Sequence, residues 1–116
     1  MNYREQRLGA AAVFLLPSLK LKEPGHNTPS PESRLHSFLM ENFGGYTAQA
    51  GNIFGYWKDE SGADSYGEHR EFTVALTDDS KLPLLKRHLA ALARDMGEEC
   101  IYLQTAGETF LIYPES

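Results

Sequence analysis

The chain has 116 residues, a length that predicts one domain with a hydrophobic core large enough to fold without disulfides or a metal. Its hydrophobic fraction of 41% is typical of a globular protein and excludes an intrinsically disordered one. The net charge of −5, with lysines and arginines scattered along the chain, excludes general binding to nucleic acid, which needs clustered positive charge.

The first predicted element is a strand at residues 8–16, an apolar run without alternation that is typical of a strand covered on both faces. A signal peptide is the alternative, because Arg4 and Arg7 precede the run. No small-residue cleavage pattern follows, however, and the nine residues are too few to span a membrane as a helix. We therefore expect a cytoplasmic protein that makes no contact with a membrane.

A long loop over residues 17–30 leads into a predicted helix at 31–43. Ser30 supplies a capping hydroxyl, and Pro31 stands in the first turn, where no amide donor is needed. Apolar residues then recur at helical spacing, and glycine ends the helix. The apolar face consists of Leu35, Phe38, Leu39 and Phe43.

Two strands are expected next, at residues 46–58 and 70–77, joined by a polar loop over 59–69. A second helix follows at 80–96, with Asp79 or Ser80 as its cap. Five apolar residues at steps of three and four define its buried face. These residues are Leu82, Leu85, Leu89, Leu92 and Met96.

The chain closes with a predicted hairpin of strands at 100–104 and 109–113. Its first residue, Cys100, is the single cysteine, which excludes a disulfide within the chain. A small buried apolar residue is the favoured interpretation of this cysteine, and a nucleophile is the alternative.

This element order predicts an α+β fold, the ferredoxin-like βαββαβ sandwich with an extra C-terminal hairpin strand. In that topology the first and third strands are central, and two helices cover one face of an antiparallel sheet. The first and last strands are nevertheless apolar on both faces. We therefore predict that a second copy covers the other face, giving a homodimer or a higher homo-oligomer through the sheet.

A resemblance supports this fold. The runs Gly55–Asp59 and Arg70–Val74, followed by a helix and a closing hairpin, resemble small bacterial proteins of unknown function with a ferredoxin-like fold. The likeness concerns the order of elements over roughly residues 8–113. The fold hosts enzymes, nucleotide sensors and binding modules, so the resemblance implies the architecture and leaves the activity open.

The densest group of reactive side chains surrounds the loop over 59–69. His69 and Glu71 are two residues apart, so on a strand they share one face, where they could act as a base with its orienting partner. They could also ligate a metal if His26 or His36 supplied a third ligand. A charged strand facing solvent, without a metal, is the favoured interpretation.

Aromatic residues are the other candidates for a binding site, because their rings offer apolar area with a polar tip to a planar small molecule. Trp57 and Tyr66 are the leading ligand-binding candidates, together with the cationic Arg70. The further rings that could line such a pocket are Tyr46, Tyr56, Tyr102 and Tyr113.

Three functions are compatible with these patterns. The favoured one is a non-catalytic, oligomeric domain that binds a small ligand or a protein partner. The first alternative is a small enzyme of the dimeric α+β barrel type, without an organic cofactor, whose pocket lies between sheet and helices and uses His69, Glu71 or a tyrosine as base. The second is a PII-like nucleotide sensor with Arg70 on a phosphate. The sequence identifies no cofactor and no particular ligand.

Overall fold

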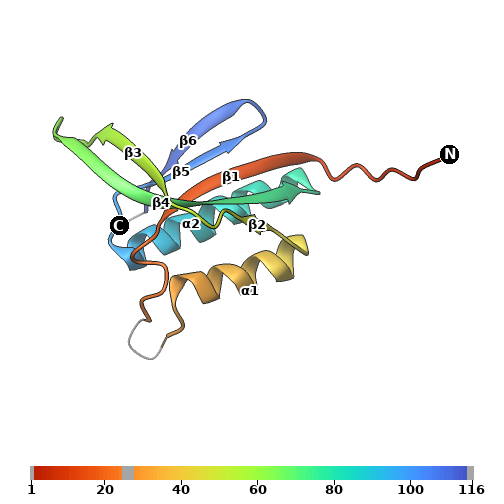
Figure 1. Ribbon diagram of the computed structural model, residues 1–116, viewed down its shortest axis with the longest axis horizontal. Helices are drawn as coiled ribbons and strands as arrows, with labels where there is room; N and C mark the ends of the chain where they lie inside the picture. The colour runs from red at the N-terminus through yellow and green to blue at the C-terminus, as the bar shows by residue number, and fades with distance from the viewer. Residues whose placement is uncertain (1, 25–27, 115–116) are drawn as a thin grey trace.

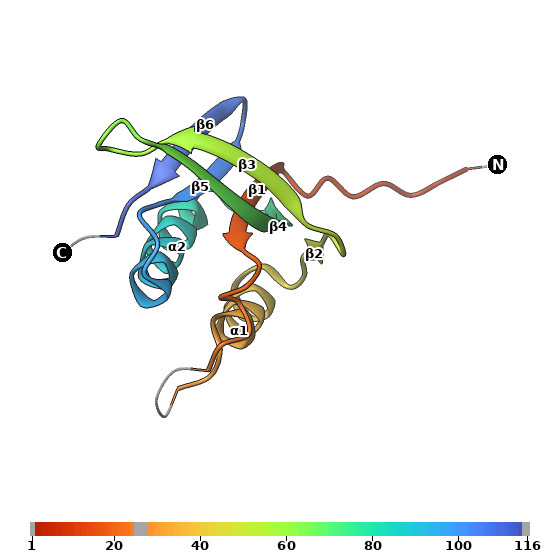
Figure 2. The same ribbon diagram turned by 60° about the vertical axis from the view of Figure 1, so that its left-hand side comes forward.

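The computed structural model describes residues 2–24 and 28–114. Its strands form one antiparallel sheet in the order β2-β4-β1-β5-β6, and β3 pairs with the other end of β4, on the same edge as β2. Both helices lie on one face of this sheet (Figures 1 and 2). The elements are β1 (Ala10–Pro17), α1 (Pro31–Phe43), β2 (Thr47–Ala48), β3 (Ile53–Lys58), β4 (Asp64–Leu76), the 3-10 helix η1 (Asp79–Lys81), α2 (Leu82–Met96), β5 (Ile101–Thr105) and β6 (Glu108–Ile112).

This arrangement confirms the predicted ferredoxin-like α+β fold. β1 and β4 are its central strands, since β1 lies between β4 and β5, while β4 lies between β1 and the edge formed by β2 and β3. β6 is the extra strand and pairs with β5. None of the helices in the described ranges is long and apolar enough to cross a membrane.

The core fills the layer between the sheet and the two helices. Alternate residues of β1 and β4 point into it, and Phe14 of β1 lies opposite Phe72 of β4 with the two rings stacked at 5.6 Å. Both helices contribute the apolar faces that their sequence spacing predicts. The fully buried large side chains are Phe14, Leu16, Leu21, Leu35, Leu39, Val74, Leu85, Leu89, Leu92, Ile101 and Leu103.

The hairpin of β3 and β4 differs from its prediction. β4 begins at Asp64, six residues before the predicted start, so the loop shrinks to residues 59–63. Asp59 closes that loop, because its Oδ1 accepts hydrogen bonds from the backbone amides of Ser61 and Ala63, each at 3.0 Å. The strand predicted at 46–58 is interrupted between β2 and β3. The result is a long hairpin that extends beyond the helices (Figure 1).

The start of α2 also differs from its prediction. Neither predicted cap holds the long helix; Asp78 instead accepts a hydrogen bond from the amide of Ser80 at 2.9 Å and caps the short η1 turn. α2 then begins at Leu82, with Pro83 in its first turn, where its missing amide donor costs nothing.

The second face of the sheet, called the open face from here on, has no helix over it in the described part of the chain. Val13 and Leu15 of β1 are half-buried there. Tyr102 and Leu111 lie beside them on β5 and β6 and are 37% and 54% exposed. The open face therefore keeps the apolar character that the sequence predicts for both faces of β1.

His88 of α2 gives the fold a testable dependence on pH. Its ring stacks on Phe38 of α1 at a centroid distance of 3.9 Å, and its Nε2 is buried without a hydrogen-bond partner among the described residues. Burial, reinforced by the nearby Arg34, lowers the pKa of His88 from its ordinary value of 6.5 to about 4.

The unfolded chain consequently binds a proton at His88 below pH 6.5, whereas the folded chain does so only near pH 4. We expect the free energy of unfolding to fall as the pH drops from 6.5 toward 4, because the unfolded state then binds more protons. Urea denaturation at neutral and acidic pH measures this effect. His88→Phe keeps the stacked ring and should flatten the profile; an unchanged profile would contradict a neutral, buried His88.

Candidate functional site

The alternation of β4 separates the predicted site residues onto two faces. Phe72 points into the core, so Tyr66 and Arg70, an even number of residues away, lie on the helix side of β4. His69 and Glu71 lie on the open face. These four residues therefore do not form one cluster with Trp57, although their closeness in sequence suggested it.

The open face holds a cavity of about 310 Å³, called the open-face cavity below. It lies between the β3–β4 hairpin, the β5–β6 hairpin and the segment that follows α2. Its apolar and aromatic walls come from Leu15, Tyr56, Trp57, Tyr102, Leu111 and Tyr113. Its polar groups come from Lys58, His69, Glu98, Glu99 and Cys100.

Two glycines bring Trp57 and His69 together in this cavity. Gly55 of β3 lies directly opposite Gly67 of β4, and the rings of Trp57 and His69 meet over them edge to face, with centroids 5.8 Å apart. A Cβ on Gly67 would lie only 2.6 Å from Cε1 of His69 and 2.9 Å from Cη2 of Trp57. Glycine at 67 is therefore required for the two rings to lie against the sheet.

The surroundings of His69 favour its neutral form. Burial under Trp57 lowers its pKa, although the carboxylate of Glu98 acts in the opposite direction. Its Nδ1 is buried and has no hydrogen-bond partner in the part of the chain that the structure describes. Glu71 does not line the cavity, and no hydrogen bond between the described side chains joins it to His69. The predicted base with an orienting carboxylate is thus not assembled.

Cys100 and Tyr113 form the end of the cavity near the C-terminus. Cys100 is half-buried. The prediction made it the first residue of a strand, but in the structure it comes directly before β5, which begins at Ile101. Burial and the charge of Glu99 raise the pKa of its thiol. A raised pKa disfavours the thiolate, the form that acts as a nucleophile. Cys100 is nevertheless only half-buried, less than the small buried residue that the sequence favoured.

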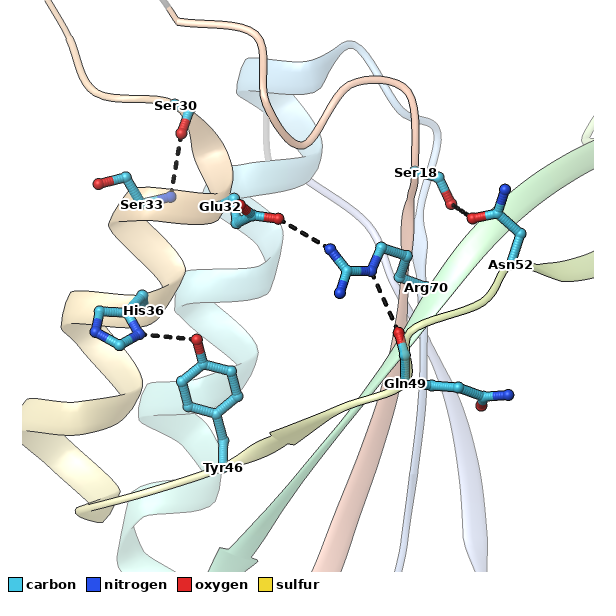
Figure 3. Close-up of polar contacts among 9 residues, drawn as sticks. All are labelled: Ser18, Ser30, Glu32, Ser33, His36, Tyr46, Gln49, Asn52 and Arg70. Atoms are coloured by element: carbon cyan, nitrogen blue, oxygen red, sulfur yellow. Dashed lines mark hydrogen bonds and ion pairs between the residues drawn. The ribbon is translucent and has the colours of Figure 1, made fainter.

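Arg70 lies on the other face and holds α1 against the sheet (Figure 3). Its guanidinium donates to Glu32 in the first turn of α1 at 3.1 Å and to the backbone oxygen of Gln49 at 3.3 Å. Beside it, Nδ1 of His36 and the hydroxyl of Tyr46 are 2.8 Å apart. A nucleotide sensor would need the Arg70 guanidinium to bind a phosphate. In this structure the guanidinium instead links β4 to α1 and to the segment after β2.

Tyr66 lies neither in the open-face cavity nor beside Arg70, but in a cluster of rings on the β3–β4 hairpin. Its ring packs on Tyr56 at 5.0 Å and on Phe54 at 6.1 Å. Tyr56 lines the open-face cavity, but Tyr66 and Phe54 do not. All three rings are largely exposed. Of the three predicted ligand-binding residues, only Trp57 lines the open-face cavity.

A metal site at His69 finds no third ligand among residues 2–24 and 28–114, where no group of three suitable side chains comes together. Of the two third ligands considered from the sequence, His36 lies on α1 beside Tyr46. His26 lies outside the described residues.

Sequence reasoning missed several cavity residues, namely Leu15, Gly55, Glu98 and Glu99. It also missed Gly67, which lies opposite Gly55 beneath the rings of Trp57 and His69. The glycine pair left a faint signal, since Gly55 and Gly67 stand symmetrically about the loop at 59–63. Glu98 and Glu99 gave no signal in the sequence. They lie in the segment after α2, and its sequence does not indicate on which face of the sheet its side chains lie.

The comparisons with known proteins concern the fold. No family model and no curated protein matches the chain. Among solved structures, a phage SAM lyase in complex with S-methyl-5'-thioadenosine matches 99% of this chain and 97% of its own, with 14% identity and a TM-score of 0.60. A phage SAM lyase in the apo state matches 98% of both chains, with 16% identity and a TM-score of 0.48. The first likeness establishes a shared fold over nearly the full length of both proteins.

This finding contradicts the interpretation of the chain as a non-catalytic binding or regulatory domain, because the protein that shares its fold is an enzyme. The alternative of a small enzyme is better supported. Two cavities bear on the pocket expected for such an enzyme. His69 lines the open-face cavity, on the sheet face opposite the helices. Tyr46 and Arg70 line a second cavity of about 430 Å³ between α1 and the β2–β4 edge of the sheet.

Proposed function

We propose that the chain is an enzyme that cleaves S-adenosylmethionine (SAM) and releases S-methyl-5'-thioadenosine, with the open-face cavity as its active site. The fold shared with a phage SAM lyase over 99% of this chain supports the reaction class. The observation that carries the proposal for this chain is the cavity itself, which gathers aromatic, acidic and imidazole groups on a sheet face without helices.

The cavity suits a nucleoside with a positively charged side chain. Its volume of about 310 Å³ lies at the lower end of the range for small-molecule sites. Trp57, Tyr102 and Tyr113 offer ring faces on which a purine can stack, and such faces also attract cations. In its neutral form His69 can donate or accept a hydrogen bond to or from a ligand without adding a positive charge to the cavity.

The chemistry makes modest demands on the protein. The carboxylate oxygen of the substrate's own methionine moiety attacks the γ-carbon and closes a lactone ring, while the bond between that carbon and the sulfonium sulfur breaks. The sulfur keeps both electrons of the broken bond and leaves as a neutral thioether. That leaving group needs no proton, so the site has no need of a strong general acid. Binding of the substrate on ring faces is the main contribution that Trp57 and its neighbours would make.

The direct test is incubation of the purified chain with SAM, followed by chromatographic detection of S-methyl-5'-thioadenosine. We expect the thioether to accumulate in proportion to protein concentration, above the slow spontaneous decay of SAM measured with heat-denatured protein. Accumulation at the spontaneous rate, at every SAM and protein concentration tried, would refute the proposal.

We further propose that the chain acts as a homodimer or higher homo-oligomer through the open face, in the cytoplasm. The half-buried Val13 and Leu15 and the exposed Leu111 form an apolar surface that a second copy would cover. Because Leu15 and Leu111 also line the open-face cavity, the second copy would border the mouth of that cavity. Light scattering coupled to size-exclusion chromatography should give a mass that is a multiple of 13.0 kDa. A monomer at micromolar concentration would refute this part of the proposal and leave the SAM assay unaffected.

A further inference from the structure

The carboxylates of the open-face cavity differ in whether a cation already neutralises them. Glu98 forms an ion pair with Lys20 at 2.6 Å, and Lys58 on the opposite wall pairs with Asp64. Glu99 also lines the cavity, and no ion pair involves it among the residues that the structure describes. It is therefore the uncompensated charge of the cavity wall.

A second carboxylate adds to this negative field. Burial is the main cause that raises the pKa of Cys100 and of Tyr113, and the negative charges of Glu99 and of Glu60, in the loop between β3 and β4, raise the pKa of both groups further. The end of the cavity formed by Cys100 and Tyr113 therefore experiences negative charge from two different segments of the chain.

A sulfonium is well matched to such surroundings. Its charge spreads over the adjoining methyl and methylene groups and it donates no conventional hydrogen bond, so it is held by nearby anions and by ring faces. S-adenosylhomocysteine, the thioether that differs from SAM by one methyl group, has almost the same shape and no charge on its sulfur. Ring stacking and apolar contacts contribute about equally to the affinity for the two ligands. The charge on the sulfonium is therefore the main feature by which the cavity can discriminate between them.

We infer that Glu99 is a specificity-determining residue, which makes the open-face cavity bind the positively charged sulfonium in preference to the neutral thioether. This inference rests on the proposed function and adds a reason for turnover. Cleavage of the carbon–sulfur bond removes the positive charge that Glu99 holds, so the product binds more weakly than the substrate and leaves the cavity. Glu99 acts on affinity for the ligand's charge and takes no part in bond cleavage.

The test compares two stable ligands that share the same nucleoside and amino acid portions. Sinefungin carries a protonated amine in place of the sulfonium, and S-adenosylhomocysteine carries a neutral thioether. Trp57 is the single tryptophan and lines the cavity, so its fluorescence reports binding of each ligand directly. We expect sinefungin to bind roughly tenfold more tightly than S-adenosylhomocysteine at low salt.

Glu99→Gln keeps the shape of the side chain and removes its charge. We expect this change to reduce the preference for sinefungin by about two- to fivefold, since Glu99 is exposed and solvent screens its charge. Affinity for S-adenosylhomocysteine should stay unchanged. Glu41→Gln, an exposed position on α1 across the sheet from the cavity, is the matched control and should leave both affinities as they are.

Equal affinities for the two ligands, or an equal loss of both in Glu99→Gln, would overturn the inference. If the protein still forms S-methyl-5'-thioadenosine from SAM in that case, the proposed function stands. If neither ligand binds and no thioether forms, both the inference and the proposed function are wrong.

Discussion

Trp57→Ala should reduce the catalytic efficiency of SAM cleavage by about 10- to 100-fold, because stacking of one base on one aromatic ring contributes on the order of 1–3 kcal/mol. Most of the loss should appear as a higher KM, since the indole holds substrate and transition state alike. The side chain is 39% exposed, so its removal should cost little folding stability. Formation of S-methyl-5'-thioadenosine over a range of SAM concentrations measures the effect.

Tyr66→Ala is the matched control for this experiment. Tyr66 is another ring on the same hairpin, 50% exposed, that packs on Phe54 and Tyr56 and does not itself line the cavity. Its removal should leave KM within about twofold of the unsubstituted protein, because surface changes away from a site have small effects. An equal loss in both variants would show that the hairpin as a whole matters and that the cavity is not the site.

Phe14→Ala should lower the free energy of unfolding by about 3–5 kcal/mol, a large part of the 5–15 kcal/mol that holds a typical domain together. Phe14 is fully buried in β1 and its ring stacks on Phe72 at 5.6 Å. Truncation removes that contact and leaves a cavity between sheet and helices that the surrounding strands cannot close. Urea denaturation monitored by circular dichroism measures the loss.

Phe54→Ala removes the same side chain from a position that is 60% exposed, so we expect a change of only about 0.5 kcal/mol. The pair of variants therefore tests which sheet face carries the core. Comparable losses for Phe14 and Phe54 would contradict the assignment of the helix-covered face as the core.

The element order was predictable because it depends on local physics. The bounds of α1 follow from the Ser30 cap, the proline after it and the glycine at its end. The bounds of β4 were not predictable, since residues 64–69 are polar and extend only because β3 pairs with them. The interruption between β2 and β3 likewise depends on pairing with β4, which no local pattern reports.

The candidate site was predictable only in part. Trp57 and His69 were identified as reactive or aromatic groups in one region of the sequence, and the structure places them in contact. Tyr66 and Arg70 were grouped with them by closeness along the chain, although successive strand residues point to opposite faces. Glu99 and Tyr113 reach the same cavity through the pairing of β5 and β6, which joins residues far apart in sequence.

The sequence by itself determined the two helices, the central strands and the apolar character of both faces of β1, because spacing, caps and turns are local properties. Only the tertiary structure decided where the cavity lies and which side chains enter it. Long-range strand pairing sets the register, and the register decides which face each residue occupies. The pair of glycines at 55 and 67 illustrates this division, since their role exists only once β3 and β4 lie side by side.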